Sequence, residues 1–226
     1  MYIEGDVNMG VLENYLSTNC DKRITGLVNF SLEEGFLLFN KIIKENEYLK
    51  ANDFRNSYGM LRHSCIDFVL KNEFRRKDID ANITEKIVSP NGYKYPVIEA
   101  KGLIMTYHKV FKPYSMPKSA WNRDNRSFLN KEISLFDDEF NESYGELTTP
   151  YVMATYGGYD YKLQFRRLGI PNVGCTKWID QINIENSLYV VKPYTGSQEK
   201  DLELSLNNRI KQYLEVRDNN DGTKKN

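Results

Sequence analysis

The spacing of apolar residues changes near residue 80, and this change limits the folds open to the chain. Before that point, apolar residues recur every three or four positions, which is the period of an amphipathic helix. Two such stripes follow one another: Leu32, Phe36, Phe39 and Ile43, and then Phe54, Tyr58, Leu61, Cys65 and Phe68. We therefore predict a mainly helical region over about residues 1–77, with these two helices packed on each other.

Each predicted helix has a candidate first residue. Ser31 and Glu34 stand three positions apart, the spacing of a capping box in which two side chains bond backbone N–H groups of the first turn. Asp53 precedes the second stripe and is a suitable cap for it. The two helices are thus expected to begin near residues 31 and 53.

After residue 80 the chain has the composition of strands joined by tight turns. Asn91-Gly92 separates two β-rich runs, which is a strong short-range signal for a hairpin. Gly157-Gly158 marks a second predicted hairpin, and residues 187–194 are expected to form a further short strand. Proline cannot donate a hydrogen bond to a neighbouring strand, so Pro96 places its own strand at a predicted sheet edge.

The C-terminal part returns to a helical period. Leu202, Leu206, Ile210 and Leu214 form one apolar stripe, so a closing helix is predicted over about 198–216. Residues 218–226 are polar and are expected to form a flexible tail. Helices, then hairpins over about 80–195, then a helix predict one α+β domain, residues 1–217, with an antiparallel sheet.

The overall composition excludes several classes of protein. Lysine plus arginine equals aspartate plus glutamate, 31 each, so the net charge gives no general attraction to nucleic acid or membranes. The three cysteines are scattered and have no zinc-binding spacing. With no secretion signal and no long apolar run, we expect a cytoplasmic protein without a membrane span. The abundance of Asn, Lys, Ile and Tyr favours a bacterial or phage origin.

A glutamate and a lysine stand inside a predicted strand, in the stretch "VIEAK". Glu99 and Lys101 resemble half of the motif of PD-(D/E)xK nucleases, in which the two residues share one face of a strand. The resemblance implies that Glu99 binds a divalent ion and that Lys101 orients or deprotonates a water molecule. Such a site also needs a second carboxylate that reaches the same ion.

The predicted hairpin offers Glu99 no second carboxylate. A two-residue turn at Asn91-Gly92 places Thr84 opposite Glu99 and Lys86 opposite Val97. This arrangement favours an exposed set of charged side chains over a catalytic pair. A different register, or a carboxylate from Asp137, Asp138 or Glu139, would restore the nuclease interpretation.

Residues 108–131 combine cations with aromatic rings. The segment contains one acid, Asp124, against Lys109, Lys112, Lys118, Arg123, Arg126 and Lys131, and it also contains Phe111, Tyr114, Trp121 and Phe128. Cations that meet phosphates, beside rings that stack on bases, are typical of surfaces that bind single-stranded nucleic acid. The acidic stretch that follows, residues 135–146, could instead neutralise the segment, and an acidic protein partner is a further alternative.

The sequence thus favours a non-enzymatic binding protein of bacterial or phage origin that needs no cofactor. It would contact nucleic acid or a protein through the segment 108–131, with these candidate contact residues: Lys109, Lys112, Lys118, Trp121, Arg123 and Arg126. One alternative is a metal-dependent nuclease of a mobile or defence element that uses Glu99, Lys101 and a divalent metal. The other is a regulatory protein–protein interaction module whose interface is the helical region. No Ser/His/Asp set can be assembled by spacing, and His63 is expected at the surface.

Overall fold

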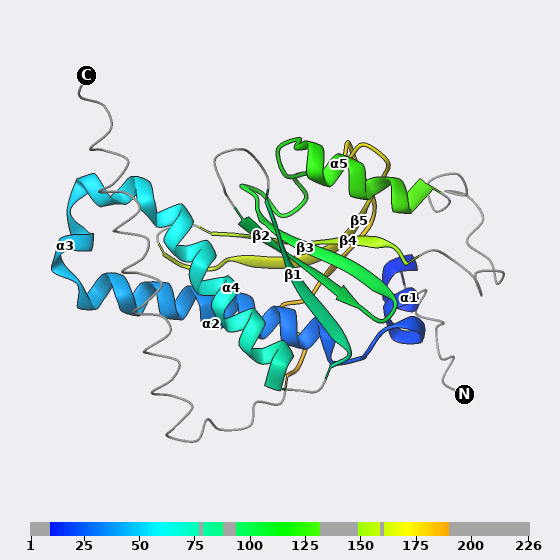
Figure 1. Ribbon diagram of the computed structural model, residues 1–226, viewed down its shortest axis with the longest axis horizontal. Helices are drawn as coiled ribbons and strands as arrows, with labels where there is room; N and C mark the ends of the chain where they lie inside the picture. The colour runs from blue at the N-terminus through cyan, green and yellow to red at the C-terminus, as the bar shows by residue number, and fades with distance from the viewer. Residues whose placement is uncertain (1–9, 77–78, 88–93, 132–148, 159–160, 190–226) are drawn as a thin grey trace, which may run out of the picture. The chain divides into compact units, whose positions relative to one another are not determined.

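A mixed β-sheet forms the centre of the fold (Figure 1). In the part of the chain that the structure describes, the sheet has six strands in the order β1-β2-β3-β4-β5-β6. They are β1 (Ala81–Ile87), β2 (Lys94–Ala100), β3 (Leu103–Lys109), β4 (Tyr151–Gly157), β5 (Phe165–Pro171) and β6 (Trp178–Asn183). All neighbouring pairs are antiparallel except β3 and β4, which run parallel. The prediction of a purely antiparallel sheet is therefore wrong.

The structure is a computed structural model that describes residues 10–76, 79–87, 94–131, 149–158 and 161–189. Its helices are α1 (Val11–Asn19), α2 (Ile24–Glu45), α3 (Glu47–Lys50), α4 (Tyr58–Arg76) and α5 (Trp121–Ser127), with 3-10 helices η1 (Asn52–Ser57) and η2 (Phe128–Asn130). The α+β class is confirmed. The predicted closing helix, about 198–216, and the tail after it lie outside the described residues.

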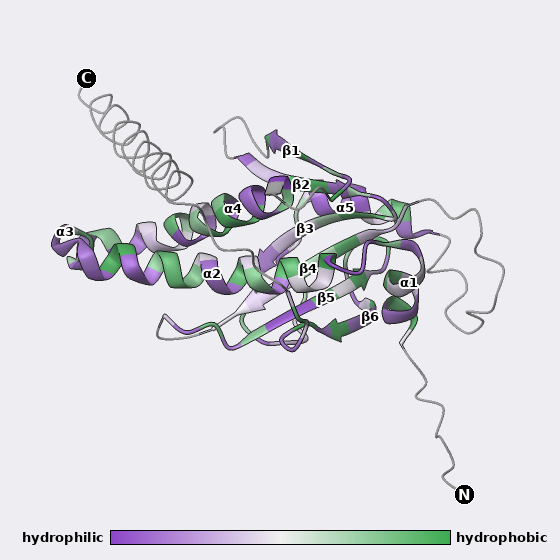
Figure 2. Ribbon diagram, turned by 90° about the horizontal axis from the view of Figure 1, so that it is seen from below, coloured by the Kyte–Doolittle hydropathy of each residue, from purple (hydrophilic) through white to green (hydrophobic). Residues whose placement is uncertain are grey.

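The helices α2 and α4 lie side by side and cover one face of the sheet (Figure 2). They approach closely at Gly35, where an added Cβ would stand 2.7 Å from the Cα of Ile66. The core between helices and sheet includes Leu32, Phe36, Ile66, Leu70, Leu103, Met105, Val152, Ala154, Leu168 and Ile170. The predicted packing of two amphipathic helices is confirmed.

The predicted starts of both helices are wrong. The apolar stripe of α2 continues before residue 31 through Ile24 and Leu27, so the helix begins at Ile24. Ser31 consequently lies inside α2, fully buried, and cannot open a capping box. Asp53 lies in η1, five residues before the first residue of α4. The apolar stripe therefore determines where the helix begins, and the capping-box spacing inside it does not.

The strands β1 and β2 pair antiparallel as predicted, but their register differs by two residues. Thr84 stands opposite Val97, and Glu99 stands opposite Asn82. The connection covers residues 88–93, outside the described residues, so the predicted two-residue turn at Asn91-Gly92 does not set the register. Because side chains alternate with a period of two, a shift of two residues keeps each side chain on its predicted face.

A second hairpin follows at once, between β2 and β3, and the sequence reasoning missed it. Ala100 pairs with Leu103, so Lys101 and Gly102 form the connection. Gly102 has a φ of 83°, and an added Cβ would lie 2.4 Å from the carbonyl oxygen of Asn19. Only glycine suits both demands. Lys101 is consequently part of a turn and does not share a strand with Glu99.

Pro96 does not lie on an edge strand, because β2 has β1 on one side and β3 on the other. The pairing of β2 with β3 is short, however, and covers only Ile98 to Ala100. Pro96 therefore lies in a part of β2 that has one paired neighbour, β1. Because β3 does not pair with this part of β2, the N–H group that Pro96 lacks is not needed for hydrogen bonds to β3. This explains why a proline occurs in an internal strand.

The second predicted hairpin, β4–β5, is also present, with a longer connection than expected. Gly157 is still paired, with Phe165, so the glycine pair is not a two-residue turn. The strand β6 follows β5 in a further antiparallel pair that was not predicted. Residues 187–189 form no strand, and the rest of the predicted strand 187–194 lies outside the described residues.

The parallel pair β3–β4 requires a long crossover, since the chain must return to the end at which β3 began. Residues 110–150 make this connection, and they contain α5 and η2. Met116 and Leu129 from the crossover pack against Tyr151 and Met153, which are buried on the sheet face opposite to α2 and α4. The crossover thus places the basic, aromatic segment on the face of the sheet that α2 and α4 do not cover.

Candidate functional site

The short helical segment α5–η2 buries polar side chains and exposes aromatic ones. Trp121 and Phe128 keep 77% and 61% of their surface exposed, whereas Asn122 and Ser127 are buried. Spacings of three and four residues place one set of side chains on a single side of the helix. We call this set, Trp121, Asn125, Phe128 and Lys131, together with Lys118 of the loop that precedes the helix, the outer face; all five residues are exposed.

Hydrogen bonds to backbone groups hold α5–η2 in this orientation. The Asn130 amide donates to the carbonyl oxygens of Tyr151 and Pro171, at 2.9 and 2.8 Å, and its oxygen accepts the Tyr151 N–H at 2.8 Å. The Ser127 hydroxyl accepts the Gly174 N–H at 2.8 Å. These bonds fix the inner side of the segment to the start of β4 and the end of β5, so the outer face points to solvent.

Arg123 and Arg126 lie on the inner side and are half-buried. Arg126 donates from Nη1 to the Tyr95 hydroxyl at 2.7 Å and to the Asn122 carbonyl at 2.8 Å, and its guanidinium carbon lies 5.3 Å from the centroid of the Tyr95 ring. Arg123 donates to the carbonyl of Lys118. Both arginines therefore connect α5 to its surroundings as well as carrying charge.

A chain of polar side chains lies on β3 and β4 beneath α5. The Thr106 hydroxyl lies 2.7 Å from Nε2 of His108 and 2.6 Å from the Tyr151 hydroxyl. Burial lowers the pKa of His108 well below its ordinary value, and the positive charges of Arg123 and Arg126 lower it further. The His108 imidazole is therefore neutral at pH 7.

The loop before α5 rests on β5 and β6. The Tyr114 ring lies 4.2 Å from the guanidinium carbon of Arg167, and the Tyr114 carbonyl accepts the Trp178 indole N–H at 3.2 Å. Phe111 and Lys112 are exposed in the same loop. The loop thus adds a lysine and exposed aromatic surface to the crossover.

The six predicted contact residues are not all brought together. Lys118 and Trp121 belong to the outer face, Arg123 and Arg126 to the inner side, and Lys112 to the loop. Lys109 lies near Arg62 of α4. Partial burial lowers the pKa of Lys109, and the positive charge of Arg62 lowers it further. Phe128, Asn125 and Lys131 were not among these six residues, although their helical spacing from Trp121 is visible in the sequence.

Glu99 and Lys101 form no catalytic pair in the described residues. Glu99 is exposed and stands opposite Asn82, and Lys101 lies in the turn, where its N–H donates to the carbonyl of Asp80 at 3.3 Å. No group of three His, Cys, Asp or Glu in the described ranges is placed to hold a metal ion. The alternative carboxylates at 137–139 lie outside those ranges.

His63 is not a surface residue, contrary to the prediction. Its side chain is 18% exposed, its ring centroid lies 4.7 Å from that of Tyr107, and its Nε2 lies 3.9 Å from Oδ1 of Asp67. Burial lowers the His63 pKa to about 4, and the positive charge of Lys71 contributes to this shift. His63 is therefore a neutral part of the packing between α4 and β3.

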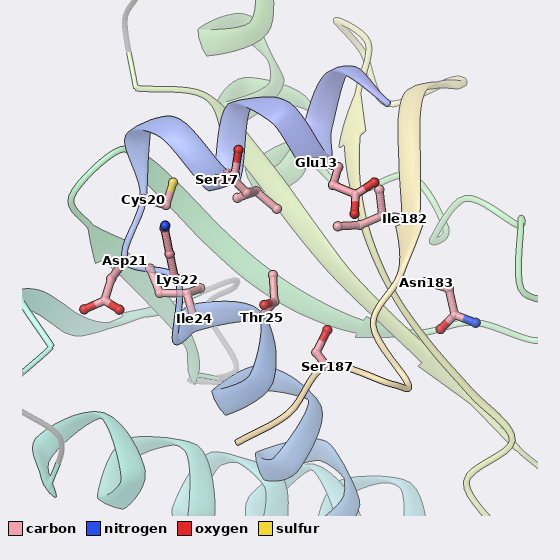
Figure 3. A pocket seen from close by; sticks show the side chains of 11 residues that line it. Glu13, Ser17, Cys20, Asp21, Lys22, Ile24, Thr25, Ile182, Asn183 and Ser187 are labelled. Atoms are coloured by element: carbon pink, nitrogen blue, oxygen red, sulfur yellow. The ribbon is translucent and has the colours of Figure 1, made fainter. Parts of the chain in front are cut away.

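A pocket of about 380 Å³ lies between α1, the start of α2 and β6. Figure 3 shows Glu13 and Ile182 at one end of it and Cys20, Asp21 and Lys22 at the other. Burial raises the pKa of the Cys20 thiol to about 11, so the thiol is protonated at neutral pH and is a poor nucleophile. The pocket thus offers space and polar groups without an activated residue.

Known proteins give no further guide. Comparisons with protein families, with curated proteins and with solved structures find no match to this chain. Across the described residues, no helix combines the length and the apolar character that crossing a membrane requires. The outer face of α5–η2 is consequently the candidate site on which a function has to be argued from its own chemistry.

Proposed function

We propose that this chain binds single-stranded nucleic acid through the outer face of α5–η2. The observation that carries the proposal is the distribution of side chains on α5–η2. The segment buries the polar side chains of Asn122, Ser127 and Asn130 and exposes the aromatic rings of Trp121 and Phe128. Leaving a large apolar side chain in water forgoes about 1.5–3 kcal/mol relative to burying it. A ligand that covers the two rings recovers this free energy, and nucleobases offer flat surfaces of the right kind.

The charges around the rings favour the same ligand. Lys118 precedes Trp121 and Lys131 follows Phe128, so an exposed ammonium group flanks each ring along the chain. The outer face contains no carboxylate. Asp124, the one acid in the segment 108–131, lies half-buried and accepts a hydrogen bond from Ser119 at 2.9 Å. Ring surfaces for bases and exposed ammonium groups for phosphates therefore occur together on α5–η2 and the residues directly beside it.

The distance between the rings sets the kind of strand that fits. Trp121 and Phe128 are seven residues apart, which corresponds to about 10 Å along a helix. This separation is too long for both rings to stack on one base. Each ring is therefore expected to take a separate base of an extended strand, which a duplex with paired and stacked bases does not present.

The test measures binding by fluorescence anisotropy, with labelled single-stranded DNA and RNA and the matching duplexes. Trp121→Ala and Phe128→Ala are each expected to weaken binding of the single strand by about 10- to 100-fold, the effect of losing one stacking platform. Tyr48→Ala is the matched control, because Tyr48 is 83% exposed on α3, outside the crossover. It is expected to bind like the parent protein.

Lys118→Ala gives an independent measurement. Removing one phosphate contact reduces the slope of log K against log salt concentration by about 0.7 for a single strand. Polyglutamate serves as the competitor for the acidic-protein alternative, because it offers charge without flat bases. One outcome would contradict the proposal: the parent protein binds polyglutamate but no oligonucleotide, and Trp121→Ala binds polyglutamate as tightly as the parent does. The ligand would then be an acidic protein and not a nucleic acid.

A further inference from the structure

Two cations beneath the outer face have no ion-pair partner in the described part of the chain. Arg123 and Arg126 stand three residues apart on the inner side of α5, and both are half-buried. Neither forms an ion pair with a carboxylate of the described residues. Two half-buried guanidinium groups without a carboxylate partner are suited to an anion, which would balance their charge.

The hydrogen bonds that the two arginines already make leave donors for such an anion. Both bonds of Arg126 leave from Nη1, and the bond of Arg123 leaves from Nη2. The remaining N–H groups of each planar guanidinium keep the fork geometry that matches two oxygens of a phosphate. Tyr95, whose hydroxyl accepts from Arg126, keeps its own O–H for donation.

One acid, Asp124, lies near Arg123, since both charges act on Cys175, but its Oδ2 accepts a hydrogen bond from Ser119 and it forms no ion pair with either arginine among the described residues. His108 and Thr106 lie on the strand beneath α5, joined by a contact of 2.7 Å, and the imidazole is neutral. The charges of Arg123 and Arg126 both reach His108, since both lower its pKa. The two guanidinium groups and the His108 ring therefore belong to one electrostatic environment, whose net charge from these groups is positive.

We propose that Arg123 and Arg126, with the Tyr95 hydroxyl, bind a terminal phosphate monoester of a nucleic-acid strand. A monoester carries close to two negative charges at pH 7, whereas a phosphodiester inside a strand carries one, so the monoester balances both guanidinium groups. The inference rests on the proposed function for the strand itself. Because Trp121 lies on the same helix, the first bases and the strand end would engage one element.

The experiment compares three oligonucleotides of one sequence that carry a 5′-phosphate, a 3′-phosphate or hydroxyl groups at both ends. One phosphorylated strand is expected to bind about 10- to 100-fold more tightly than the hydroxyl strand, the gain of charge-assisted hydrogen bonds. Arg123→Gln and Arg126→Gln are each expected to bring its affinity down to about that of the hydroxyl strand. Arg55→Gln is the matched control, since Arg55 is exposed on η1.

Arg126→Lys keeps the charge and removes the fork, so it serves where Arg126→Gln lowers the melting temperature. It is expected to retain only part of the preference for the phosphorylated strand. Equal affinity of the parent protein for all three strands would overturn the inference and leave the proposed function intact. Inorganic phosphate and a mononucleotide test whether the two arginines bind a small phosphate-containing ligand instead of a strand end.

If no strand binds, but phosphate or the mononucleotide raises the melting temperature of the parent and not of Arg123→Gln, the anion site stands with a small ligand. The proposed function and the strand-end ligand then both fail, and only an anion site at the two arginines remains. If neither strands nor phosphate have any effect, both proposals fail.

Discussion

The two faces of the sheet are covered by helices that bury opposite kinds of side chain. On one face, α2 and α4 turn a continuous apolar surface inward, including Phe36 and Leu70. On the other face, α5–η2 turns Asn130 and Ser127 inward and leaves Trp121 exposed. The first arrangement gains free energy from removing apolar surface from water, which is non-directional. The second is fixed by directional hydrogen bonds together with the apolar contact of Leu129, and it keeps its two aromatic rings available.

This contrast separates stability from function. A layer that packs by apolar burial needs no ligand to explain its sequence. A helix that exposes its rings has a sequence that its own fold does not explain, because exchanging the inner and outer residues would bury more apolar surface. The predictions below test whether the two layers differ in this way, beginning with the largest expected effect.

Removing apolar volume from the α2–α4 layer should have the largest effect on stability. Leu70 is fully buried, so Leu70→Ala is expected to lower the free energy of unfolding by about 2–5 kcal/mol. Met60→Ala, at an exposed position of the same helix, is expected to change it by less than about 0.5 kcal/mol. Urea denaturation measures both. Equal losses in the two variants would contradict the assignment of the core.

Each face of the sheet has one histidine with a lowered pKa, His63 of α4 on one face and His108 of β3, beneath α5, on the other. For His63 the folded pKa, about 4, lies below the ordinary value of 6.5, so the unfolded chain binds the proton more readily. Stability is therefore complete above about pH 7 and is lost as the pH falls from 6.5 to 4. The shift corresponds to a loss of about 3 kcal/mol.

His63→Phe keeps a ring against Tyr107 and removes the titration. It is expected to flatten the decline in unfolding free energy between pH 6.5 and 4, while the part that His108 contributes remains. Thermal or urea unfolding across this pH range measures the difference. A decline as steep as in the parent protein would show that His63 does not titrate below its ordinary range.

Asn130→Leu tests the polar side of α5–η2. The substitution leaves two backbone carbonyls and the Tyr151 N–H without their side-chain partner, and each such buried group costs about 1–3 kcal/mol if water cannot reach it. A net loss of about 2 kcal/mol and weaker oligonucleotide binding are expected. Asn14→Leu, at an exposed position of α1, should change neither. A more stable Asn130→Leu protein would show that this layer is an ordinary apolar one.

The sequence predicted those parts of the fold that local spacing determines. The pairing of α2 with α4 follows from two apolar stripes, and the hairpins β1–β2 and β4–β5 follow from turn residues between β-rich runs. The parallel pairing of β3 with β4 was missed because it joins residues that are far apart in the chain. The turn at Lys101-Gly102 was missed because the pattern of Glu99 and Lys101 suggested one continuous strand.

The candidate site shows the same limit. The composition of residues 108–131 pointed to the segment, and the seven-residue spacing of Trp121 and Phe128 is visible without a structure. Which side of α5 faces solvent depends on Asn130 reaching β4 and β5. The inward position of Arg126 depends on Tyr95 of β2, a residue that no local pattern connects to it.

The smallest effect is expected for Glu99→Gln. Glu99 is exposed between Asn82 of β1 and Ile104 of β3, and it forms no ion pair with the described residues. Lys86, which the predicted register brought near Glu99 on the same face, stands opposite Tyr95, four residues along β1 from Asn82 and therefore about 13 Å away. The substitution should change the unfolding free energy by less than about 0.5 kcal/mol.

A metal-binding glutamate would behave differently, because Glu99→Gln would remove a magnesium-dependent cleavage of DNA or RNA. Melting curves and cleavage assays with and without Mg²⁺ distinguish the two cases, and cleavage by the parent that disappears in Glu99→Gln would restore the nuclease alternative.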